Sequence, residues 1–356
     1  MRGKRAVGKK SFGILLLLTP LLLVTLLPAG CSPSKPKMVG GAVVEPGKPP
    51  VNPLTGEEVS SWDLLIRRPL AVKVENDPQA RPQSGIINAD LVYEELVEGG
   101  MTRFICVYLA RDSLSIGPTR SARPSDIDIT CFLDPLLICS GGASHVISML
   151  RASGMMFITE DSRHFWRDRS RRAPHNLYTS TDLLRAYLEE SGDDYCRLPD
   201  SGLVFDSQTQ TGEGGSGGDS AASATEINIR YKAATCAASY QYDAASDSYL
   251  HSINGAPHTD LTTGKRVAPR NVIVQVVTVT WSGARDAAGA QTPNLGVVGS
   301  GKCLVFSGGK VYTGTWEKAD RGSPTRFKDP LGNPIRLRPG QTWIHLVTED
   351  IGVDYR

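Results

Sequence analysis

The chain changes its sequence character at residues 208–225, and this change constrains the fold more than any other feature. The segment turns to Gly, Ser, Ala, Thr and acidic residues, and it contains the run GEGGSGG at 212–218. A stretch of this composition cannot bury enough apolar surface to offset the entropy of ordering its backbone. We therefore expect a flexible linker or insert at residues 206–226, with folded chain on either side.

The part before this segment alternates between strand-like and helical patterns. Strands are predicted at residues 70–75, 91–97, 103–109 and 136–139, and Gly99-Gly100 predicts a hairpin between the second and the third. A helix over 91–98 is an open alternative, because Glu and Leu favour helix there. Helices are predicted at residues 125–132, at 144–151 with Ser144 as the cap, and from Thr179-Ser180 to Gly192. This alternation is typical of an α/β domain.

The part after the segment is rich in strands and poor in helical periodicity. Strand-like runs occur at residues 240–242, 272–279, 302–306, 311–316, 335–337 and 342–347, broken by Gly, Pro and Asn turns. The tryptophans Trp281, Trp316 and Trp343 could stack on sugars, but their strand context favours core packing.

The first thirty-one residues have the pattern of a secretory leader. Lys4, Arg5, Lys9 and Lys10 precede an apolar run at 14–27, and small residues lead to Cys31. The run is short for a membrane span of about 20 residues. A cysteine directly after Ala-Gly resembles the lipobox of bacterial lipoproteins, although Pro28 stands where Leu is usual. We expect Cys31 to carry acyl chains such as palmitate, to anchor the protein at the extracytoplasmic face of the cell membrane, and to be followed by a flexible tether at 32–66.

Composition excludes several classes of partner. Apolar residues make up 40% and charged residues 21% of the chain, as in an ordinary globular protein. The formal net charge of +2 gives no general electrostatic reason to bind nucleic acid. The chain lacks the lysine of a phosphate-binding loop and a dinucleotide fingerprint, so no cofactor is expected. His145, His164 and His175 are spaced too irregularly for a zinc motif, so no metal is expected.

The cysteines of the mature chain show no regular framework. They are Cys106, Cys131, Cys139, Cys196, Cys236 and Cys303. The apolar surroundings of the first three favour buried free thiols. A bridge between Cys196 and Cys236 remains open.

Ordered motifs in both halves resemble one family. In the first half they are RPLAV at 68–72, ARPQSG at 80–85, ADLVYE at 89–94, VEGG at 97–100, TRF at 102–104, IGPTRSARP at 116–124 and APHNLY at 173–178. In the second half they are GK at 309–310, GTW at 314–316, PT at 324–325, GNPI at 332–335 and PGQTWI at 339–344. The chain is similar to the YerB-like bacterial lipoproteins, also called the DUF3048 family. The resemblance implies a layered N-terminal α/β domain with a mixed sheet at 67–205 and a β-rich C-terminal domain at 227–356. It implies no activity.

The most unusual chemical feature is a long region with arginine but no lysine. Between Lys73 and Lys232 every basic side chain other than histidine is Arg. A guanidinium binds carboxylate or phosphate through two parallel hydrogen bonds, which lysine cannot do. Arg120 and Arg123 precede a predicted helix start, where backbone N–H groups also favour an anion. We predict that Arg81, Arg103, Arg120 and Arg123 line an anion-binding cleft.

Internal bracing is the alternative interpretation of these arginines. In that case their guanidiniums pair with carboxylates such as Glu75, Glu94, Glu98, Asp126 and Asp168, and no open site remains.

Catalysis is the second class of function that the sequence leaves open. Glu94, Glu98 or Asp168 could supply a carboxylate pair for hydrolysis of a wall polysaccharide. His175 could act as a base beside Ser121, Ser140 or Ser144, but no nucleophile elbow is present. The sequence therefore favours a lipid-anchored envelope protein that binds an anionic ligand or a protein partner. A hydrolase or transferase acting on cell-wall material is the alternative.

Overall fold

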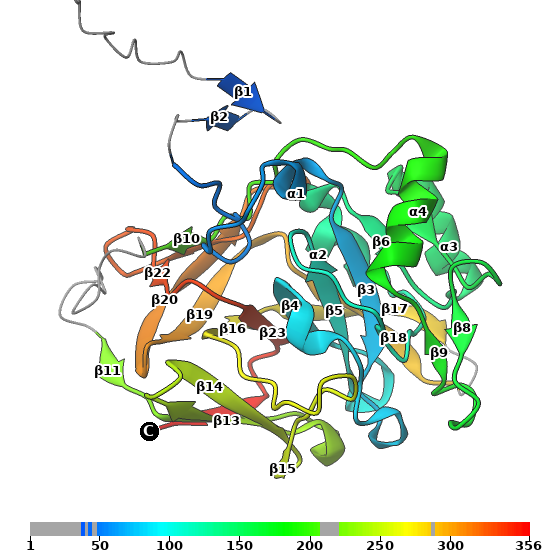
Figure 1. Ribbon diagram of the computed structural model, residues 1–356. Helices are drawn as coiled ribbons and strands as arrows, with labels where there is room; N and C mark the ends of the chain where they lie inside the picture. Colours follow the sequence, from blue (N-terminus) through cyan, green and yellow to red (C-terminus); the bar gives the residue numbers. More distant parts are fainter. Residues whose placement is uncertain (1–36, 40–41, 45–47, 207–220, 286–288) are drawn as a thin grey trace, which may run out of the picture. The chain divides into compact units, whose positions relative to one another are not determined.

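The largest element of the fold is a sheet that contains strands from both halves of the chain. The computed structural model describes residues 37–39, 42–44, 48–206, 221–285 and 289–356. The strand order is β11-β20-β19-β16-β23-β4-β5-β3-β6-β7, with β21 paired to β20 (Figure 1). The strands are β3 (Leu70–Glu75), β4 (Leu91–Leu96), β5 (Thr102–Tyr108), β6 (Leu136–Ile138), β7 (Phe157–Ile158), β11 (Ala222–Ser223), β16 (Asn271–Val276), β19 (Gly299–Ser307), β20 (Lys310–Lys318), β21 (Arg326–Lys328) and β23 (Thr342–Val347).

The sheet is mixed, as predicted. β5 is antiparallel to both β3 and β4, whereas β3, β6 and β7 are mutually parallel. β23 pairs in parallel with both β16 and β4. The β23–β4 pairing aligns Trp343 with Val92 and His345 with Glu94, so it joins the two halves edge to edge. The predicted fold class, an α/β N-terminal part followed by a β-rich C-terminal part, is confirmed.

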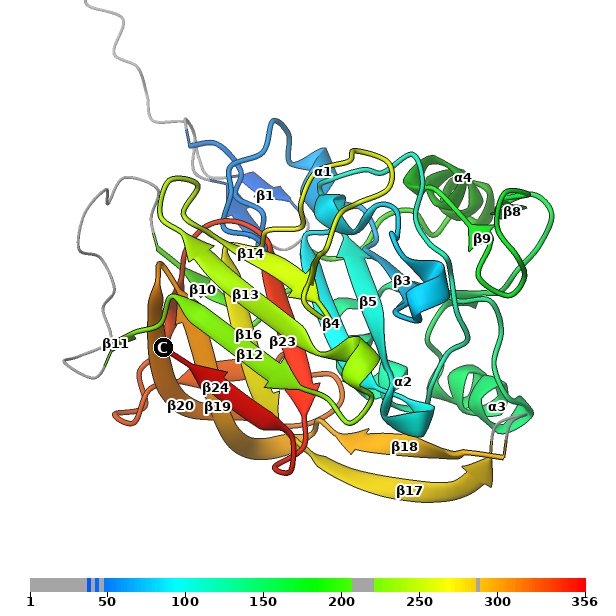
Figure 2. The same ribbon diagram turned by 90° about the horizontal axis from the view of Figure 1, so that it is seen from below.

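A second sheet is built from C-terminal strands alone. Its order is β15-β14-β13-β12-β24, and Figure 2 shows it from the side on which it covers the C-terminal strands of the large sheet. The strands are β12 (Glu226–Arg230), β13 (Ala238–Asp243), β14 (Ser248–Ile253), β15 (Ala256–Pro257) and β24 (Gly352–Tyr355).

Short hairpins and pairs complete the β-structure. They are β1 (Lys37–Val39) with β2 (Ala42–Val44), β8 (Trp166–Arg167) with β9 (Leu177–Tyr178), β10 (Val204–Phe205) with β22 (Arg336–Leu337), and β17 (Thr278–Arg285) with β18 (Gln291–Gly296).

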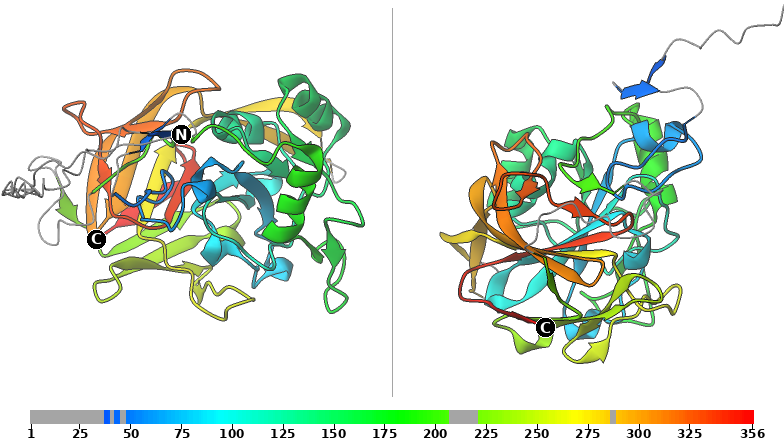
Figure 3. Two further views of the ribbon diagram at one scale, coloured as in Figure 1. Left: turned by 45° about the horizontal axis from the view of Figure 1, so that its top comes forward. Right: turned by 90° about the vertical axis from the view of Figure 1, so that its left-hand side faces the viewer.

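The helices gather on the N-terminal half of the sheet, as the colours in Figure 3 show. They are α1 (Asp63–Ile66), α2 (Ser125–Thr130), α3 (Ser144–Ser153) and α4 (Thr181–Ser191). The Ser180 side chain caps α4 by accepting from the Leu183 N–H, and Gly192 ends it in the left-handed conformation, as predicted. The predicted cap of α3 is wrong by one residue. Ala143 has the extended backbone of the cap, so Ser144 is already helical.

Local patterns predicted β3 with its observed bounds, and they predicted the β4–β5 hairpin. The helical alternative for residues 91–98 is wrong, because β4 is paired on both sides, with β5 and β23. Gly99 and Gly100 both have positive φ, 69° and 72°, in the turn that joins the two strands.

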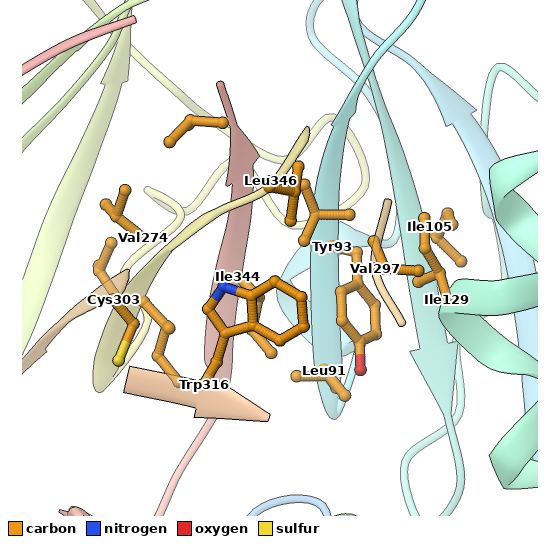
Figure 4. Close-up of a cluster of buried hydrophobic side chains, with 14 of the residues drawn as sticks. Leu91, Tyr93, Ile105, Ile129, Val274, Val297, Cys303, Trp316, Ile344 and Leu346 are labelled. Carbon is orange, nitrogen blue, oxygen red and sulfur yellow. The ribbon is translucent and has the colours of Figure 1, made fainter. Parts of the chain in front are cut away.

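Two apolar clusters fill the two faces of the sheet, because successive side chains of a strand point to opposite sides. On one face Tyr93, Ile105 and Ile344 pack with Trp316 and with Ile129 of α2 (Figure 4). The other face includes Val72, Phe104 and Trp343, which belong to the same cluster as Leu184 and Leu188 of α4. Trp316 and Trp343 are therefore core residues, as predicted. Trp281 is 54% exposed on the β17–β18 hairpin, so its predicted burial is wrong.

Residues 48–66 pack against the body, so ordered chain begins earlier than the sequence predicts. Leu54 and Leu65 are fully buried, and the Asn52 side chain donates to the Asp90 carboxylate at 2.9 Å. Cys31 and the run at 212–218 lie outside the described residues. Within the described ranges, no helix is long and apolar enough to cross a membrane.

The six cysteines that the structure describes carry free thiols. Cys106 and Cys139 are buried, as predicted, and Cys131 is half-buried. Cys196 and Cys236 are not bridged, and the Cys196 thiol contacts the Arg67 carbonyl at 3.7 Å.

Candidate anion-binding site

Three charged residues lie level with one another on adjacent strands. Arg103 on β5 is in register with Glu75 on β3 and with Glu95 on β4. In-register residues of neighbouring strands project from the same face of a sheet. A simple cross-strand arrangement would give Arg103 a carboxylate on each side. Both carboxylates instead have other partners.

Glu95 belongs to a fully buried ion cluster. Its carboxylate binds Lys73 and also accepts from the Ser125 hydroxyl at 2.8 Å. Lys73 Nζ donates to Asp126 Oδ1 at 2.6 Å as well. Burial lowers the pKa of Lys73 to about 8, and the Asp126 carboxylate opposes that shift. The four side chains satisfy one another, and Glu95 is no longer available to Arg103.

Glu75 is shared by two other cationic or polar partners. Arg120 Nε lies 2.8 Å from Glu75 Oε1, and His175 Nδ1 lies 2.9 Å from Glu75 Oε2. The carboxylate is almost completely buried, whereas the Arg120 side chain is 21% exposed. Glu75 therefore holds Arg120 and His175 in place.

Arg123 is braced by Glu98. Its Nε and Nη2 atoms donate to Glu98 Oε2 at 2.9 and 2.5 Å, and the Thr292 hydroxyl donates to Glu98 Oε1 at 2.7 Å. Burial alone would raise the pKa of Glu98, but the hydrogen bonds and charge of Arg123 outweigh it, so that pKa is lowered. The Arg123 backbone N–H donates to Asp126 Oδ2 at 2.7 Å, so this carboxylate occupies the start of α2, where the sequence predicted room for an anion.

Arg103 is left without a carboxylate. Its Nη1 donates to the Ser121 carbonyl at 2.9 Å, and no carboxylate in the described ranges lies within 4.0 Å of its guanidinium. None of its remaining N–H groups is sealed from solvent. Burial is the main cause that lowers the pKa of Arg103 to about 9; the charges of Arg123 and Arg120 also lower it, and those of Glu98 and Glu75 oppose them. Arg103 therefore lies among both arginines and carboxylates but is paired with none of the carboxylates.

The loop whose carbonyl accepts from Arg103 also carries a hydroxyl group that lies close to a second one. The loop that carries Ser121 runs along the loop after β6, because Ser140 N donates to the Arg120 carbonyl at 3.0 Å and Ala122 N donates to the Gly141 carbonyl at 2.8 Å. This pairing brings the Ser121 and Ser140 hydroxyls to 3.5 Å. We call the set Arg103, Arg120, Arg123, Glu75, Glu98, Ser121 and Ser140 the arginine site. Arg103 is the one arginine of this set without a carboxylate partner, and neither its free N–H groups nor the Nη atoms of Arg120 are sealed from solvent.

The predicted cleft residues are thus only partly brought together. Arg103, Arg120 and Arg123 lie in one cluster. Arg81 is bound to Asn76 through its Nε, 3.1 Å from the side-chain oxygen, and through its Nη2, 2.5 Å from the carbonyl. The pairs Arg120–Glu75 and Arg123–Glu98 are those that the bracing interpretation expects. Anion binding at the arginine site stays a prediction.

The four candidate catalytic residues do not form one constellation. Glu94 accepts from Thr102 and Trp343, Glu98 is held by Arg123, and His175 contacts Glu75. Asp168 accepts from the Ser170 hydroxyl within its own turn at 2.7 Å. Within the described residues, no hydrogen bond or ion pair joins any two of these four side chains, or joins His175 to Ser121 or Ser140.

Sequence reasoning missed a buried polar network on the opposite face of the sheet. His345 Nδ1 lies 3.3 Å from Glu94 Oε2, and its two ring nitrogens lie 2.8 and 2.7 Å from the hydroxyls of Tyr231 and Tyr240. Two further histidines, His251 and His258, contact each other at 2.9 Å through their Nδ1 atoms. We call His251, His258, His345 and Glu94 the histidine network.

Burial keeps the three histidines of the histidine network neutral at neutral pH. It lowers the pKa of His345 and of His258 to about 3, and it lowers that of His251 well below its usual value. Burial also raises the pKa of Glu94 to about 7, although Thr102 and Trp343 donate to it. A polar residue at an inward position of a strand, as in Leu250-His251-Ser252, is the signal that sequence reasoning could have used. In the described chain no group of three or more His, Cys, Asp or Glu side chains is arranged to hold a metal ion.

Comparison with known proteins identifies relatives over most of the chain. Residues 54–194 match a family model described as "Protein of unknown function (DUF3048) N-terminal domain", and residues 227–344 match the C-terminal domain of the same description. The chain is 31% identical over 316 residues to "Putative lipoprotein YerB" of Bacillus subtilis (strain 168), covering 86% of this chain and 89% of the relative. The crystal structure of YerB protein from Bacillus subtilis matches with a TM-score of 0.72 at 28% identity, over 86% of this chain and 99% of that chain. These matches confirm the family resemblance carried by the sequence motifs.

Replacing Arg123 with Ala should destabilise the protein strongly. The change removes the cation that pairs with the buried Glu98 carboxylate, and loss of one partner of a buried ion pair costs about 3–5 kcal/mol. Arg163→Ala is the matched control, because the Arg163–Glu190 pair is exposed and such pairs contribute about 0–1 kcal/mol. Urea unfolding of the two variants measures both values, and equal free energies of unfolding would show that Arg123 does not brace the site.

The histidine network should make stability fall as the pH is lowered. Between about pH 4.5 and 6.5 its three histidines stay neutral when folded but take up protons when unfolded, which lowers the free energy of unfolding as pH falls. Glu94 acts in the opposite sense, because its raised pKa keeps a proton in the folded state that the unfolded chain releases. The net uptake of two protons on unfolding corresponds to about 2.7 kcal/mol per pH unit.

The variant His258→Asn tests this assignment. It removes one of the three lowered pKa values, so the dependence of unfolding free energy on pH should flatten by about 1.4 kcal/mol per pH unit. The exposed control Lys265→Gln should leave the slope unchanged. An unaltered slope in His258→Asn would contradict the prediction.

Proposed function

Since this chain belongs to the DUF3048 family, described as one of unknown function, we propose a function from its own residues: a lipid-anchored envelope protein that binds an anionic group at the arginine site. The observation that carries this proposal is the open guanidinium of Arg103. It stands in register between two carboxylates, and both carboxylates are taken by other partners.

The charge pattern around Arg103 supports an external anion. The cluster holds four cations and four carboxylates, namely Lys73, Arg103, Arg120 and Arg123 with Glu75, Glu95, Glu98 and Asp126. Lys73 pairs with two of the carboxylates, Glu95 and Asp126, so no carboxylate is left to pair with Arg103. A partly desolvated cation without a partner costs folding free energy. An anion that accepts from its free N–H groups removes that cost only when it is bound.

The geometry of the site suits a tetrahedral or planar oxyanion. A guanidinium offers parallel N–H groups that match two oxygens of a phosphate, sulfate or carboxylate. The hydroxyl of Ser121, whose carbonyl accepts from Arg103, and the neighbouring Ser140 hydroxyl are further groups able to donate to an oxygen. The braced Arg120 and Arg123 add positive potential without moving.

Anchoring through Cys31 is the second part of the proposal. A relative with 31% identity is named a lipoprotein, and the leader of this chain has the small residues and cysteine of a lipobox. A diacylglyceryl group on Cys31 would place the body at the extracytoplasmic face of the cell membrane.

The hydrolase or transferase alternative has less support. In a glycoside hydrolase, two carboxylates flank the glycosidic bond that is cleaved, in a site open to the substrate. Glu94 is 1% exposed within the histidine network, whereas Asp168 serves its own turn. The candidate catalytic residues therefore have separate structural roles and do not converge on one site.

Arg103→Gln should abolish anion binding while sparing the fold. The change removes a desolvated cation that has two like charges nearby, so the melting temperature should stay within a few degrees of the wild type or rise. Titration calorimetry of the full-length protein in detergent with inorganic phosphate, sulfate and acetate measures the binding. We expect at least a tenfold loss of affinity in Arg103→Gln.

The surface variant Arg336→Gln is the control for this experiment, because that exposed arginine lies on β22 of the C-terminal half. It should bind like the wild type. Wild-type protein that binds none of the three anions, or Arg103→Gln protein that binds them as well as the wild type does, would overturn the proposed site.

Cys31→Ala should release the protein from the membrane fraction and abolish incorporation of labelled palmitate. Two acyl chains on one residue suffice for stable anchoring, whereas a single chain binds a membrane only marginally. The control is Cys196→Ala, which removes a half-buried thiol of the body. Persistent labelling and membrane retention of Cys31→Ala would show that the anchor lies elsewhere.

A further inference from the structure

Residues 160–178 form an arm that carries β8 and β9 beyond the edge of the sheet (Figure 1). The arm holds five arginines against three carboxylates, so its formal charge is +2 with histidine neutral. The proposed binding at Arg103 makes no use of this excess charge.

Three of the five arginines serve the structure of the arm. Arg167 pairs with Glu160 and donates to the Asn176 side chain at 2.8 Å. Arg171 donates to the carbonyls of Ala80 and Pro82 at 2.7 and 2.8 Å. Arg163 makes a long, exposed pair with Glu190 at 3.5 Å.

The other two arginines, Arg169 and Arg172, point to an external partner. Both are exposed, and neither guanidinium has a hydrogen bond or ion pair with another described residue. They lie in successive turns that fix the backbone, since Arg171 N donates to the Asp168 carbonyl at 3.3 Å and His175 N donates to the Arg172 carbonyl at 3.0 Å. The two free charges are therefore held on a defined backbone.

The arm is joined to the arginine site by direct contacts. His175 ends the second turn and contacts Glu75, whose other oxygen binds Arg120. Arg120 and the turn that carries Arg172 are thus held to the same Glu75 carboxylate, the turn through His175. Trp166 lies on the same arm, 37% exposed and stacked on Tyr178 at 6.1 Å between ring centroids, and it offers a flat apolar surface.

We propose that the arm extends the arginine site into a track for a linear anionic polymer, one that carries phosphate or carboxylate groups at repeated intervals. This inference rests on the proposed function and names its ligand class. A single anion at Arg103 would leave the charges of Arg169 and Arg172 unused. A flat bilayer would reach the arm but not the half-buried Arg103, whereas a flexible chain reaches both. The exposed Trp166 ring suits the uncharged part of a repeat unit.

The test compares the double variant Arg169→Gln/Arg172→Gln with the wild type, each as full-length protein in detergent. The probes are long-chain polyphosphate, polyglutamate and inorganic phosphate. The double variant should bind at least one polymer at least tenfold more weakly at low salt. Its dependence of log affinity on log salt concentration should fall by roughly 1.4–1.8, as for two lost phosphate contacts. Its affinity for inorganic phosphate should be unchanged.

The double variant Lys265→Gln/Lys310→Gln is the matched control, because it removes two exposed charges from the C-terminal half. It should bind the polymers like the wild type. Polymer binding that is equal in wild type and arm variant overturns the track, while loss of phosphate binding in Arg103→Gln would still support the proposed function. Binding of the arm to phosphatidylglycerol vesicles without binding to either polymer would also overturn the track in favour of a membrane surface.

Discussion

The parallel pairing of β23 with β4 is the contact on which the rest of the structure depends. It joins strands that lie about 250 positions apart in the chain, and it makes one sheet out of two halves with different sequence character. The Gln341 side chain, just before β23, donates to the carbonyls of Ile86 and Ala89, which fixes the register from outside the ladder. Trp343 and His345 then meet Glu94 on one face of the joined sheet. The histidine network is therefore a consequence of this pairing and completes it with buried hydrogen bonds.

On the opposite face, the pairing of buried charges leaves one arginine without a carboxylate partner. Lys73, Glu95 and Asp126 are fully buried, and ions in such a position must satisfy one another. Their pairing takes Glu95 away from Arg103, its neighbour across the ladder. Glu75 is taken in turn by Arg120 and His175. The packing of neighbouring side chains thus determines that Arg103 is the arginine without a carboxylate partner. The residues next to Arg103 in the sequence do not indicate this.

Short-range features of this chain could be predicted, and long-range ones could not. The bounds of β3, the capping of α4 by Ser180 and the β4–β5 hairpin follow from local propensity and turn chemistry. Trp281 was misjudged because a strand in a two-stranded hairpin exposes a face that a strand in the large sheet would bury.

The arginine site was predicted in part for the same reason. The absence of lysine between residues 73 and 232 is visible in the sequence and led to the group Arg81, Arg103, Arg120 and Arg123, of which the structure brings the last three together. Which of these arginines is paired depends on how close Glu75 and Glu98 lie to it in the folded protein. Positions in the sequence do not give that distance. The histidine network escaped detection because Glu94 comes from the first half and its three histidines from the second, and their spacing forms no recognisable motif.

The choice of arginine at position 103 has a physical reason. Burial and two neighbouring guanidiniums lower its pKa from 12.5 to about 9, so it remains charged at neutral pH. A lysine has a lower unperturbed pKa than an arginine, and burial lowers the pKa of the neighbouring Lys73 to about 8 although carboxylates surround it. Glu75 and Glu95, the carboxylates in register with Arg103, pair with other side chains, so the charge at this position has to persist without a partner. A guanidinium, with its higher unperturbed pKa, meets that requirement at neutral pH better than an amine does.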